Sequence, residues 1–519
     1  MPGHQDEESI LHRCLRWESV ELPRSPARLL AAFSDLPGVA LLENPGVPSS
    51  YGRYAFVAIE PFWQFKSRGL RAWAGPPGAL EPLSGSPFAE LAALLERQGG
   101  DATLQPSGLP PFCGGAVGYI GYDCLHLIEE VPATGSDDLA LPDMYFSFYD
   151  CVYAYDLVEG TSFILATGLG ATRMEAERRA SARLQQGRRT LAARCGGSLA
   201  TDDSAASEAY RESGRQVRRQ RPQLQSRHLA ERGIVPRVSR SEYLASIEQV
   251  KDEIWRGNAF EVCLTQRFDV PVSVDGWDIY QVLRAINPTP MSAYLRFPGL
   301  EVLSASPERF LSLDRQRVAE TRPIKGTRPR ARDPEVDRAL RRELLASDKD
   351  RAENLMIVDL ARNDLGRVCE LGSVEVRELC AVEAYPYTWQ MVSTVRGRLE
   401  RRYSAVDLVR AMFPGGSMTG APKVEAMKII DRLEPTRRGV YAGAIGYFDF
   451  DGAVDLSIVI RTMIKKGDTL TFHVGGAIVA DSVAEDEYQE TLDKAHGLVT
   501  ALDVAQAWAP EPDAAGGGR

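Results

Sequence analysis

A single lysine between a proline and a glycine has the clearest capacity for covalent chemistry in this chain. It is Lys325, in the segment Arg322-Pro323-Ile324-Lys325-Gly326-Thr327, which Pro and Gly predict to be extended rather than helical. Desolvation or a neighbouring cation would lower the pKa of this amine and make it a nucleophile. Glu308, on the predicted preceding strand, would be an acid able to assist a leaving group. A lysine of this kind is more often an exposed loop residue, so the segment alone gives only a candidate.

Two acidic residues lie on the apolar face of a predicted helix over residues 350–360. With about 100° of rotation per residue, Glu353 falls in the middle of the apolar stripe and Asp350 lies beside it. A carboxylate on a buried stripe is costly unless an arginine, a proton or a metal ion compensates it. This helix alone favours an arginine partner.

A second acidic row lies on the helix predicted after Ser482, where Ser482 and Glu485 are spaced as a capping box. Glu487, Glu490 and Lys494 follow one side of that helix, next to its apolar face. By itself this row is typical of a solvated Glu–Lys surface. Two carboxylate rows that both border apolar faces instead predict a shared hard cation, and all-oxygen ligation suits Mg²⁺.

The glycine-rich stretch Phe413–Lys423 precedes a helix predicted to run to about Leu433. Backbone N–H groups at such a turn and helix start bind anions, although a tight loop without a ligand has the same composition. Arg461 follows a β-branched strand and is able to clamp a carboxylate with two hydrogen bonds. Gly475 and Gly476 end the next strand, where a backbone can approach a ligand closely.

The bulk composition limits the class of protein. The chain has 519 residues and a net charge of −10, which disfavours nucleic-acid partners and anionic membrane surfaces. Eight cysteines without a C-x-x-C pair fit reduced thiols better than disulfides or zinc. The N-terminus does not resemble a signal peptide, and no run of about 18 apolar residues occurs. These features predict a cytoplasmic protein that neither enters a membrane nor binds nucleic acid.

Composition along the chain predicts four segments. Residues 1–195 have mixed helix and strand patterns, and 196–235 are polar enough for a surface linker. Residues 236–509 have the pattern of one compact unit, whose last part contains antiparallel hairpins, including a strand over 454–464. Residues 510–519 are low in complexity and predicted to be disordered.

Taken together, these motifs resemble the chorismate-utilising enzyme family, which includes anthranilate, aminodeoxychorismate, isochorismate and salicylate synthases. The resemblance extends over most of residues 238–507, on these segments: Ser306–Phe310, Arg322–Arg330, Glu353–Val368, Phe413–Lys423, Arg438–Tyr447, Ile460-Arg461-Thr462 and Gly475–Lys494. It implies an α+β fold in which two large, mostly antiparallel β-sheets pack as a sandwich with helices outside.

Within the family, the sequence Pro-Ile-Lys-Gly-Thr is similar to that of the aminodeoxychorismate synthases, whereas anthranilate synthases usually have alanine in place of Lys325. The resemblance implies that Lys325 attacks C2 of chorismate while the C4 hydroxyl leaves, assisted by Glu308 and Mg²⁺. Ammonia then adds at C4 and expels the lysine, giving 4-amino-4-deoxychorismate without loss of pyruvate. The alternative within the family is anthranilate synthase component I, which forms anthranilate and pyruvate. A subunit without catalytic activity is a third reading, which the intact motifs disfavour.

The resemblance also assigns the remaining site residues. Glu353 and Glu490 would bind Mg²⁺ directly, with Glu487 and Asp350 nearby or bridged by water. The substrate would be held by residues from several motifs, namely Thr327, Gly415, Gly416, Ser417, Tyr441, Arg461, Gly475, Gly476 and Lys494. The chain has no cysteine in a glutaminase-type nucleophile motif, so a separate glutamine amidotransferase subunit is expected to supply ammonia.

Four residues depart from relatives. Glu261 occupies a position where water-adding members have Lys and aminating members often have Gln. Trp389 and Gln390 occupy the place where many relatives have His, which anthranilate synthases use in releasing pyruvate. The segments Leu41–Asn44 and Pro111–Asp123 are similar to the region that binds tryptophan in amino-forming members. Asn44 replaces the usual serine there, so tryptophan is a candidate ligand of residues 1–195 and its binding is open.

Overall fold

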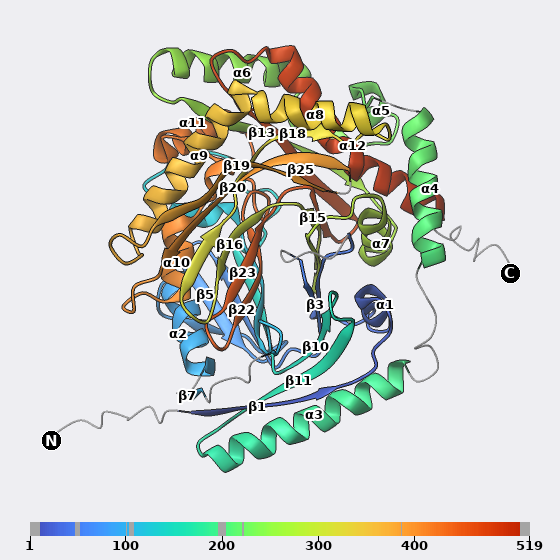
Figure 1. Ribbon diagram of the computed structural model, residues 1–519, viewed down its shortest axis with the longest axis vertical. Coiled ribbons are helices and arrows are strands. Elements are labelled where there is room, and N and C mark those ends of the chain that lie inside the picture. The colour runs from blue at the N-terminus through green and yellow to red at the C-terminus, as the bar shows by residue number, and fades with distance from the viewer. Residues whose placement is uncertain are drawn as a thin grey trace, which may run out of the picture.

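Two large β-sheets face each other in the computed structural model, which describes residues 11–46, 52–99, 101–102, 108–195, 204–220, 223–385 and 387–508. Figure 1 shows the sheets side by side with helices around them. All strand pairs are antiparallel except that between β1 and β7. The predicted α+β sandwich is confirmed.

The first sheet has 13 strands, in the order β12-β13-β25-β24-β15-β14-β2-β3-β10-β11-β1-β7, with β21 paired to β13. Its strands are β1 (His12–Ser19), β2 (Val39–Glu43), β3 (Tyr54–Ala58), β7 (Asp101–Ala102), β10 (Cys151–Asp156), β11 (Thr161–Gly170), β12 (Val235–Pro236), β13 (Glu261–Pro271), β14 (Met291–Phe297), β15 (Leu300–Ser306), β21 (Gly420–Ala421), β24 (Thr462–Lys466) and β25 (Thr469–Ile478).

The second sheet has 12 strands, in the order β18-β20-β17-β16-β23-β22-β8-β9-β4-β5-β6, with β19 paired to β20. Its strands are β4 (Trp63–Arg68), β5 (Arg71–Gly75), β6 (Glu81–Leu83), β8 (Gly115–Ile120), β9 (Met144–Tyr149), β16 (Arg309–Leu313), β17 (Val318–Thr321), β18 (Ile324–Pro329), β19 (Glu375–Ala384), β20 (Thr388–Arg398), β22 (Ala444–Asp449) and β23 (Val454–Ile458).

The helices cover the outer faces and one end of the sandwich. In Figure 1, α3 lies along β1 and β11, and α6, α8, α9, α11 and α12 gather at the opposite end. The helices are α1 (Pro26–Ala31), α2 (Pro87–Gly99), α3 (Arg173–Cys195), α4 (Ser204–Gln220), α5 (Ser226–Ala230), α6 (Arg240–Trp255), α7 (Gly276–Ile286), α8 (Pro334–Ala346), α9 (Asp348–Gly366), α10 (Ala405–Met412), α11 (Lys423–Leu433) and α12 (Ala484–Trp508), with 3₁₀ turns η1 (Tyr122–Leu127) and η2 (Gly416–Met418).

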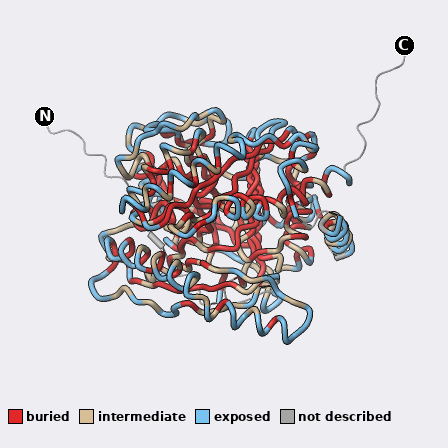
Figure 2. The backbone as a smooth tube through the Cα atoms, turned by 90° about the horizontal axis from the view of Figure 1, so that it is seen from above, coloured by how far each residue is buried: buried red, intermediate tan, exposed pale blue. Residues whose placement is uncertain are grey.

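The central strands are buried on both faces, which explains why their sequences do not alternate between apolar and polar residues. In β13, the ten residues 261–270 are all buried, because one face meets the sandwich interior and the other meets helices. Figure 2 shows the buried residues concentrated in the sheets and the exposed ones on the outer helices and loops. Side chains that project from these strands therefore reach either the core or an enclosed site.

Both halves of the chain contribute to both sheets. The largest apolar cluster includes residues from Leu22 to Ala505, so the segment 196–235 does not lie between two separate cores. Within that segment, residues 204–220 form α4, which packs on α7 and α12, and Ser226–Ala230 form α5. The predicted surface linker thus contains two helices, and the apolar side of α4 is covered, with Tyr210 and Val217 packed against the core. The predicted disordered tail, residues 510–519, lies outside the described residues.

Two local predictions are corrected. The strand predicted over 454–464 is interrupted, because Arg461 has φ of 50° and turns the chain between β23 and β24. The capping box predicted at Ser482 does not form. Its hydroxyl instead donates to Glu487 (2.6 Å) and α12 begins at Ala484.

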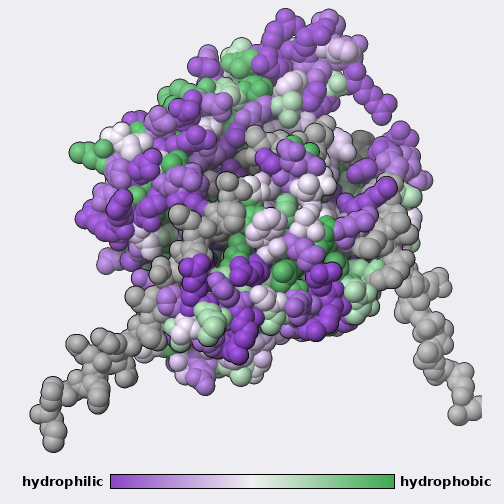
Figure 3. Space-filling model, turned by 60° about the horizontal axis from the view of Figure 1, so that its bottom comes forward, coloured by the Kyte–Doolittle hydropathy of each residue, from purple (hydrophilic) through white to green (hydrophobic). Residues whose placement is uncertain are grey.

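In Figure 3, hydrophilic residues cover most of the face that is turned forward, and hydrophobic residues form smaller patches near its centre and along its upper edge. Within the described ranges, no helix has the length and apolar character needed to cross a bilayer. All eight cysteines are free thiols and all are buried.

Candidate active site between the sheet edges

Lys325 and Glu261 meet where the ends of the two sheets converge. Lys325 lies on β18, the edge strand of the 12-stranded sheet, and Glu261 begins β13, the second strand of the other sheet. Lys325 is 9% exposed and Glu261 is fully buried, and the Lys325 Nζ donates to Glu261 Oε1 at 2.5 Å. The predicted nucleophile is therefore enclosed rather than exposed in a loop.

The charge state of Lys325 differs from the prediction. Burial acts to lower the pKa of the amine, but the Glu261 carboxylate outweighs burial and raises that pKa above its ordinary value. The expectation of a lowered pKa is thus wrong, and Lys325 beside Glu261 is an ammonium ion. A proton has to leave Lys325 before the amine can act as a nucleophile.

Glu308 is buried beside Lys325 as an acid. It lies between β15 and β16, and burial raises the pKa of its carboxyl to about 7. Hydrogen bonds from Ser417 and from the Ile324 backbone, together with the charges of Lys325 and Arg461, limit that rise. A carboxyl group with this pKa is largely protonated at pH 6 and is suited to donate a proton to a leaving group.

Arg461 reaches the same region from the turn between β23 and β24. Burial lowers the pKa of its guanidinium, and Glu308 is the charged neighbour that acts to raise it. Among the described residues, no ion pair joins Arg461 to a carboxylate. A guanidinium held here without a salt bridge is suited to bind a carboxylate of a small substrate.

The glycine-rich loop lies against Glu308. Gly415, Gly416, Ser417 and Glu308 line one hollow of about 20 Å³. A Cβ on Gly415 would lie 2.5 Å from Ile458 Cδ1, and one on Gly416 would lie 2.7 Å from Leu360 Cδ2. Close packing thus favours glycine at both positions, although the atoms in contact are the ends of flexible side chains. The binding of substrate by these glycines stays a prediction.

A buried ion pair holds this loop against β13. Arg438 donates to the carbonyl oxygens of Met418 and Cys263, each at 2.7 Å, and its charge is compensated by Glu434. Glu434 also accepts hydrogen bonds from the backbone and hydroxyl of Thr265. The hydrogen bonds of Arg438 and Glu434 are 2.7–2.9 Å long and satisfy both charged groups. The pair therefore positions the loop without exposing a charge to the site.

Strand β25 and helix α12 contribute further predicted residues. The Lys494 Nζ donates to the Gly475 carbonyl (2.8 Å) and pairs with Glu490 (2.7 Å). A Cβ on Gly476 would lie 3.0 Å from Glu487 Oε2, so the glycine lets the acid approach the strand. Tyr441 is buried and stacks on His473 of β25, with ring centroids 4.9 Å apart.

The predicted acids approach one another but have different partners. Burial raises the pKa of both Glu353 and Glu487. Desolvation acts to raise the pKa of Glu490 too, but the nearby lysines, Lys494 above all, lower it. The charge of Lys349 acts on all three acids. In the described part of the chain, no group of three or more Asp, Glu, His or Cys side chains has the arrangement of a metal site.

Asp350 is separate from these acids in its contacts. Its Oδ2 accepts from Arg328 at 3.1 Å, and its side chain packs on Gly326, where a Cβ would lie 2.8 Å from Asp350 Oδ1. The arginine partner that the first helix favoured thus exists for Asp350. Among the described residues, the one ion-pair partner of Glu353 is Lys349, at 3.8 Å.

The structure also shows the surroundings of three further residues that the sequence singled out, Thr327, Trp389 and Gln390. Thr327 is exposed on β18, and its predicted contact with substrate stays a prediction. Trp389 lies against Arg330 and donates to Asp337 (3.1 Å), which is a structural role. Gln390 is buried, and its Oε1 has no hydrogen-bond partner among the described residues. Sequence reasoning noticed Glu261 as a departure from relatives but did not predict that it pairs with Lys325.

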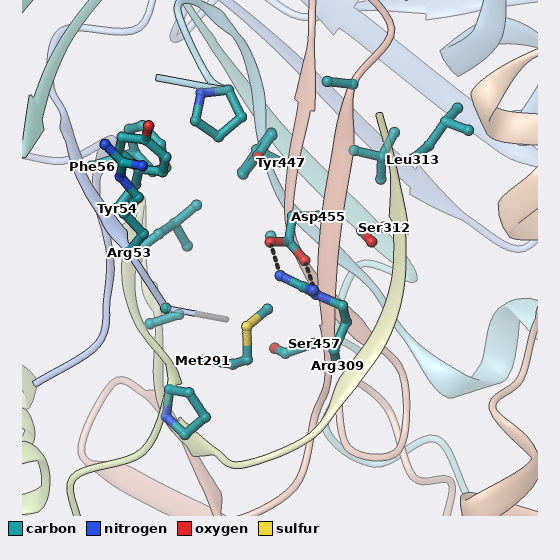
Figure 4. A pocket seen from close by; sticks show the side chains of 18 of the residues that line it. Arg53, Tyr54, Phe56, Met291, Arg309, Ser312, Leu313, Tyr447, Asp455 and Ser457 are labelled. Atoms are coloured by element: carbon teal, nitrogen blue, oxygen red, sulfur yellow. Dashed lines mark hydrogen bonds and ion pairs between the residues drawn. The ribbon is translucent and has the colours of Figure 1, made fainter. Parts of the chain in front are cut away.

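A separate cavity of about 370 Å³ lies between β2, β3 and β14 on one side and β16, β22 and β23 on the other. Figure 4 shows Arg309 and Asp455 on its wall, joined by two hydrogen bonds of 2.8 Å. Glu43 also borders the cavity, and its charge is compensated by Arg284. Asn44 donates to the Gly52 carbonyl (3.1 Å), within its own loop. This is the region expected for tryptophan, whose binding stays a prediction.

Comparison with known proteins identifies the class that this fold and site define. The family model described as chorismate binding enzyme matches residues 40–500, and the chain belongs to this family. Anthranilate synthase component 1 of Mycobacterium tuberculosis is 37% identical over 501 residues, covering 94% of this chain and 92% of that protein.

Two relatives are aminodeoxychorismate synthases. That of Streptomyces pristinaespiralis is 41% identical over 507 residues, covering 95% of this chain, and the chain spans 65% of that protein's length. That of Streptomyces griseus is 52% identical over 269 residues, which are 52% of this chain and 37% of that protein. Among solved structures, anthranilate synthase component I from Streptococcus pneumoniae aligns with a TM-score of 0.71 at 30% identity, covering 87% of this chain and 93% of that one.

Proposed function

We propose that the chain aminates chorismate at C4 to give 4-amino-4-deoxychorismate, as component I of an aminodeoxychorismate synthase. The observation that carries this proposal is the buried Lys325 amine beside Glu308, whose carboxyl has a pKa of about 7. An anthranilate synthase has no evident use for a buried lysine at this point, because the incoming ammonia is its nucleophile. Similarity to the two aminodeoxychorismate synthases supports the same assignment.

In the proposed reaction, Lys325 and Glu308 act at opposite ends of the diene of chorismate. The lysine amine forms a bond to C2, the two double bonds shift, and the C4–O bond breaks as Glu308 donates a proton to the departing hydroxyl. Ammonia then bonds to C4, the double bonds shift back, and the C2–N bond breaks. Glu308 recovers its proton from the added nitrogen, so chorismate and ammonia become the product and water.

The remaining residues bind and enclose the substrate. Arg461 is placed to bind a carboxylate of chorismate, because its guanidinium lies at Glu308 and has no salt bridge among the described residues. Where β25 meets α12, Gly475, Gly476 and Lys494 would enclose the substrate. Ammonia would come from a glutamine amidotransferase subunit, or from ammonium salts in vitro.

The experiment is a product analysis of the purified protein with chorismate, Mg²⁺ and ammonium. Aminodeoxychorismate without pyruvate is the expected result, measured by mass spectrometry and a coupled pyruvate assay. Anthranilate together with pyruvate would instead support the alternative, anthranilate synthase component I. That alternative is favoured by one observation, namely the relative that is 37% identical and covered over 92% of its length.

Mg²⁺ is the proposed cofactor, with Glu353 and Glu490 as direct ligands and Glu487 and Asp350 nearby. These acids lie in the N-terminal turns of α9 and α12, and the charge of Lys349 acts on three of them. Such a group of acids fits the binding of a divalent cation. Mg²⁺ usually takes only one or two protein carboxylates and completes its shell with water and substrate, so a cluster of three is not required. The ion would hold a substrate carboxylate against the two helices.

Removal of metal is expected to stop turnover, and added Mg²⁺ to restore it. Glu490→Gln is expected to weaken Mg²⁺ binding about 10- to 100-fold, because one of two direct ligands loses its charge. Asp350→Asn is expected to change binding much less, since Asp350 is paired with Arg328. Both affinities are measured by isothermal titration calorimetry without substrate, which reports binding independently of activity.

Glu485→Gln is the matched control for the metal experiment. Glu485 lies on the same helix as Glu490 but is exposed and paired with Arg240. Its Mg²⁺ affinity should equal that of the wild type. Equal affinity in Glu490→Gln and Glu485→Gln would rule out Glu490 as a ligand.

A further inference from the structure

The carboxylate of Glu261, which pairs with the predicted nucleophile, has a spare oxygen. Its Oε1 accepts from Lys325, whereas Oε2 is buried and has no hydrogen-bond partner among the described residues. A buried carboxylate oxygen without a partner is costly, and a catalytic role is one of the explanations for such an atom.

The buried pair between Glu434 and Arg438 provides the internal comparison. There Oε1 accepts from Thr265 and Arg438, and Oε2 accepts from Arg438, so both oxygens are satisfied. Glu43 is likewise satisfied, at Oε1 by Tyr280 and at both oxygens by Arg284. These two pairs use both carboxylate oxygens, and the pair of Glu261 with Lys325 does not. Asp269 is another buried carboxylate with an unpartnered oxygen, but its Oδ2 pairs with two arginines, Arg237 and Arg267. Glu261 is distinguished by its partner, which is the predicted nucleophile.

Within the described ranges, Lys325 has no closer acceptor for its proton than Glu261. Glu261 is the carboxylate in hydrogen-bond contact with Nζ, whereas Glu353, Glu308 and Glu490 act on Lys325 only through their charges. Glu308 has to be protonated for its own role, so it is not able to accept a second proton. The lysine reaches its nucleophilic form only if its proton has a place to go inside an enclosed site.

We propose that Glu261 is the proton acceptor for Lys325, taking the ammonium proton when chorismate binds and returning it when the lysine leaves C2. The inference rests on the proposed function. In the first half, the N–H bond of Lys325 breaks, its electron pair forms the N–C2 bond, and the proton goes to Glu261. In the second half, the electron pair of the C2–N bond returns to nitrogen, which takes the proton back from Glu261.

The chain therefore has two carboxyl groups that exchange protons independently of each other. Glu261 exchanges a proton with the nitrogen at C2, and Glu308 exchanges one with the oxygen and then the nitrogen at C4. Each carboxyl is restored at the end of a cycle, so no proton has to cross the closed site. Relatives with Gln at the position of Glu261 would have to generate the free amine differently, by desolvation alone.

The test compares Glu261→Gln with Glu261→Asp. Gln has the shape of Glu and keeps a hydrogen-bonding oxygen, but it is unable to take a proton, whereas Asp is shorter and keeps the carboxylate. With saturating Mg²⁺ and ammonium, Glu261→Gln is expected to lower kcat at least about 100-fold while the KM for chorismate stays within about threefold. Glu261→Asp is expected to be at least about tenfold faster than Glu261→Gln.

A role in packing alone would give the reverse order, because the isosteric Gln would then be the better replacement. A kcat for Glu261→Gln that is close to wild type, or higher than that of Glu261→Asp, overturns the inference. Melting curves and KM show whether each variant is folded and binds substrate.

If Glu261→Gln does not fold, Glu261→Asp still tests whether Glu261 accepts the proton of Lys325. Without ammonium, the Lys325 adduct has the added mass of chorismate minus water. Its rate of formation, followed by intact-protein mass spectrometry, should fall with kcat in Glu261→Asp. An unchanged rate of adduct formation with a lowered kcat would contradict the inference.

The same assays separate this inference from the proposed function. If the wild type forms aminodeoxychorismate but Glu261→Gln is as fast as Glu261→Asp or faster, the inference fails and the proposed function stands. If the wild type forms anthranilate and pyruvate, the proposed function fails and the inference fails with it, because Lys325 is then not the nucleophile. If the wild type does not consume chorismate, both fail together.

Discussion

Lys325→Ala lowers the kcat for chorismate amination by at least about 10³-fold, because it removes the atom that forms the covalent bond to C2. Lys325 is enclosed between the two sheets, and no other lysine of the described chain pairs with Glu261. Ammonia in solution is not held at C2, so it does not replace the amine. Steady-state kinetics with ammonium measure this loss, and the adduct of chorismate minus water is expected only in the wild type.

Lys465→Ala is the matched control. Lys465 is also largely buried and paired with a carboxylate, Glu301 at 3.8 Å, but it lies on β24 and is none of the residues placed at the site. It should retain kcat within about twofold. If Lys325→Ala retained activity, the covalent mechanism would be wrong, although chorismate would still be the substrate.

Glu308→Gln is expected to lower kcat about 10²- to 10⁴-fold, since the amide is unable to protonate the departing hydroxyl. The wild type should also lose activity as pH rises through about 7. Burial raises the pKa of Glu308 to that value, and only the protonated form acts as the acid. In the variant this descending limb of the kcat/KM profile should be absent. A profile measured between pH 5.5 and 9 tests both points.

The same carboxyl also makes folding stability depend on pH. The folded protein keeps the Glu308 proton up to about pH 7, whereas an unfolded chain releases it near 4.5, so folding stability falls as pH rises between these values. The difference of roughly 2.5 pKa units corresponds to about 3 kcal/mol above pH 7. Glu308→Gln should therefore melt at a higher temperature than the wild type at pH 8, and close to it at pH 4.5.

Glu301→Gln is the control, because it also removes a buried carboxylate, but one outside the candidate site. Glu301 lies on β15, accepts from Tyr294 and pairs with Arg296. Its kcat/KM profile should keep the wild-type limb near pH 7. A limb that persisted in Glu308→Gln would assign the titration to another group.

The sequence motifs determined the family and the fold, and they indicated which types of residue make up the candidate site. Pro323 and Gly326 fixed Lys325 in an extended segment, and the 3.6-residue period put the acids on two helices, as α9 and α12 confirm. These are local properties, and local sequence specifies them. The same pattern did not predict the break at Arg461, because a positive φ in a non-glycine residue depends on what surrounds it.

The tertiary structure alone decided which side chains meet. Glu261 and Lys325 are 64 residues apart, on strands of two different sheets, and no periodicity relates them. Their contact reversed the predicted direction of the lysine pKa, since a charge at 2.5 Å outweighs desolvation. Likewise Asp350 and Glu353, one helical turn apart, differ because Arg328 reaches only the first. Charge states and roles depend on distances through space, which the order of residues along the chain does not fix.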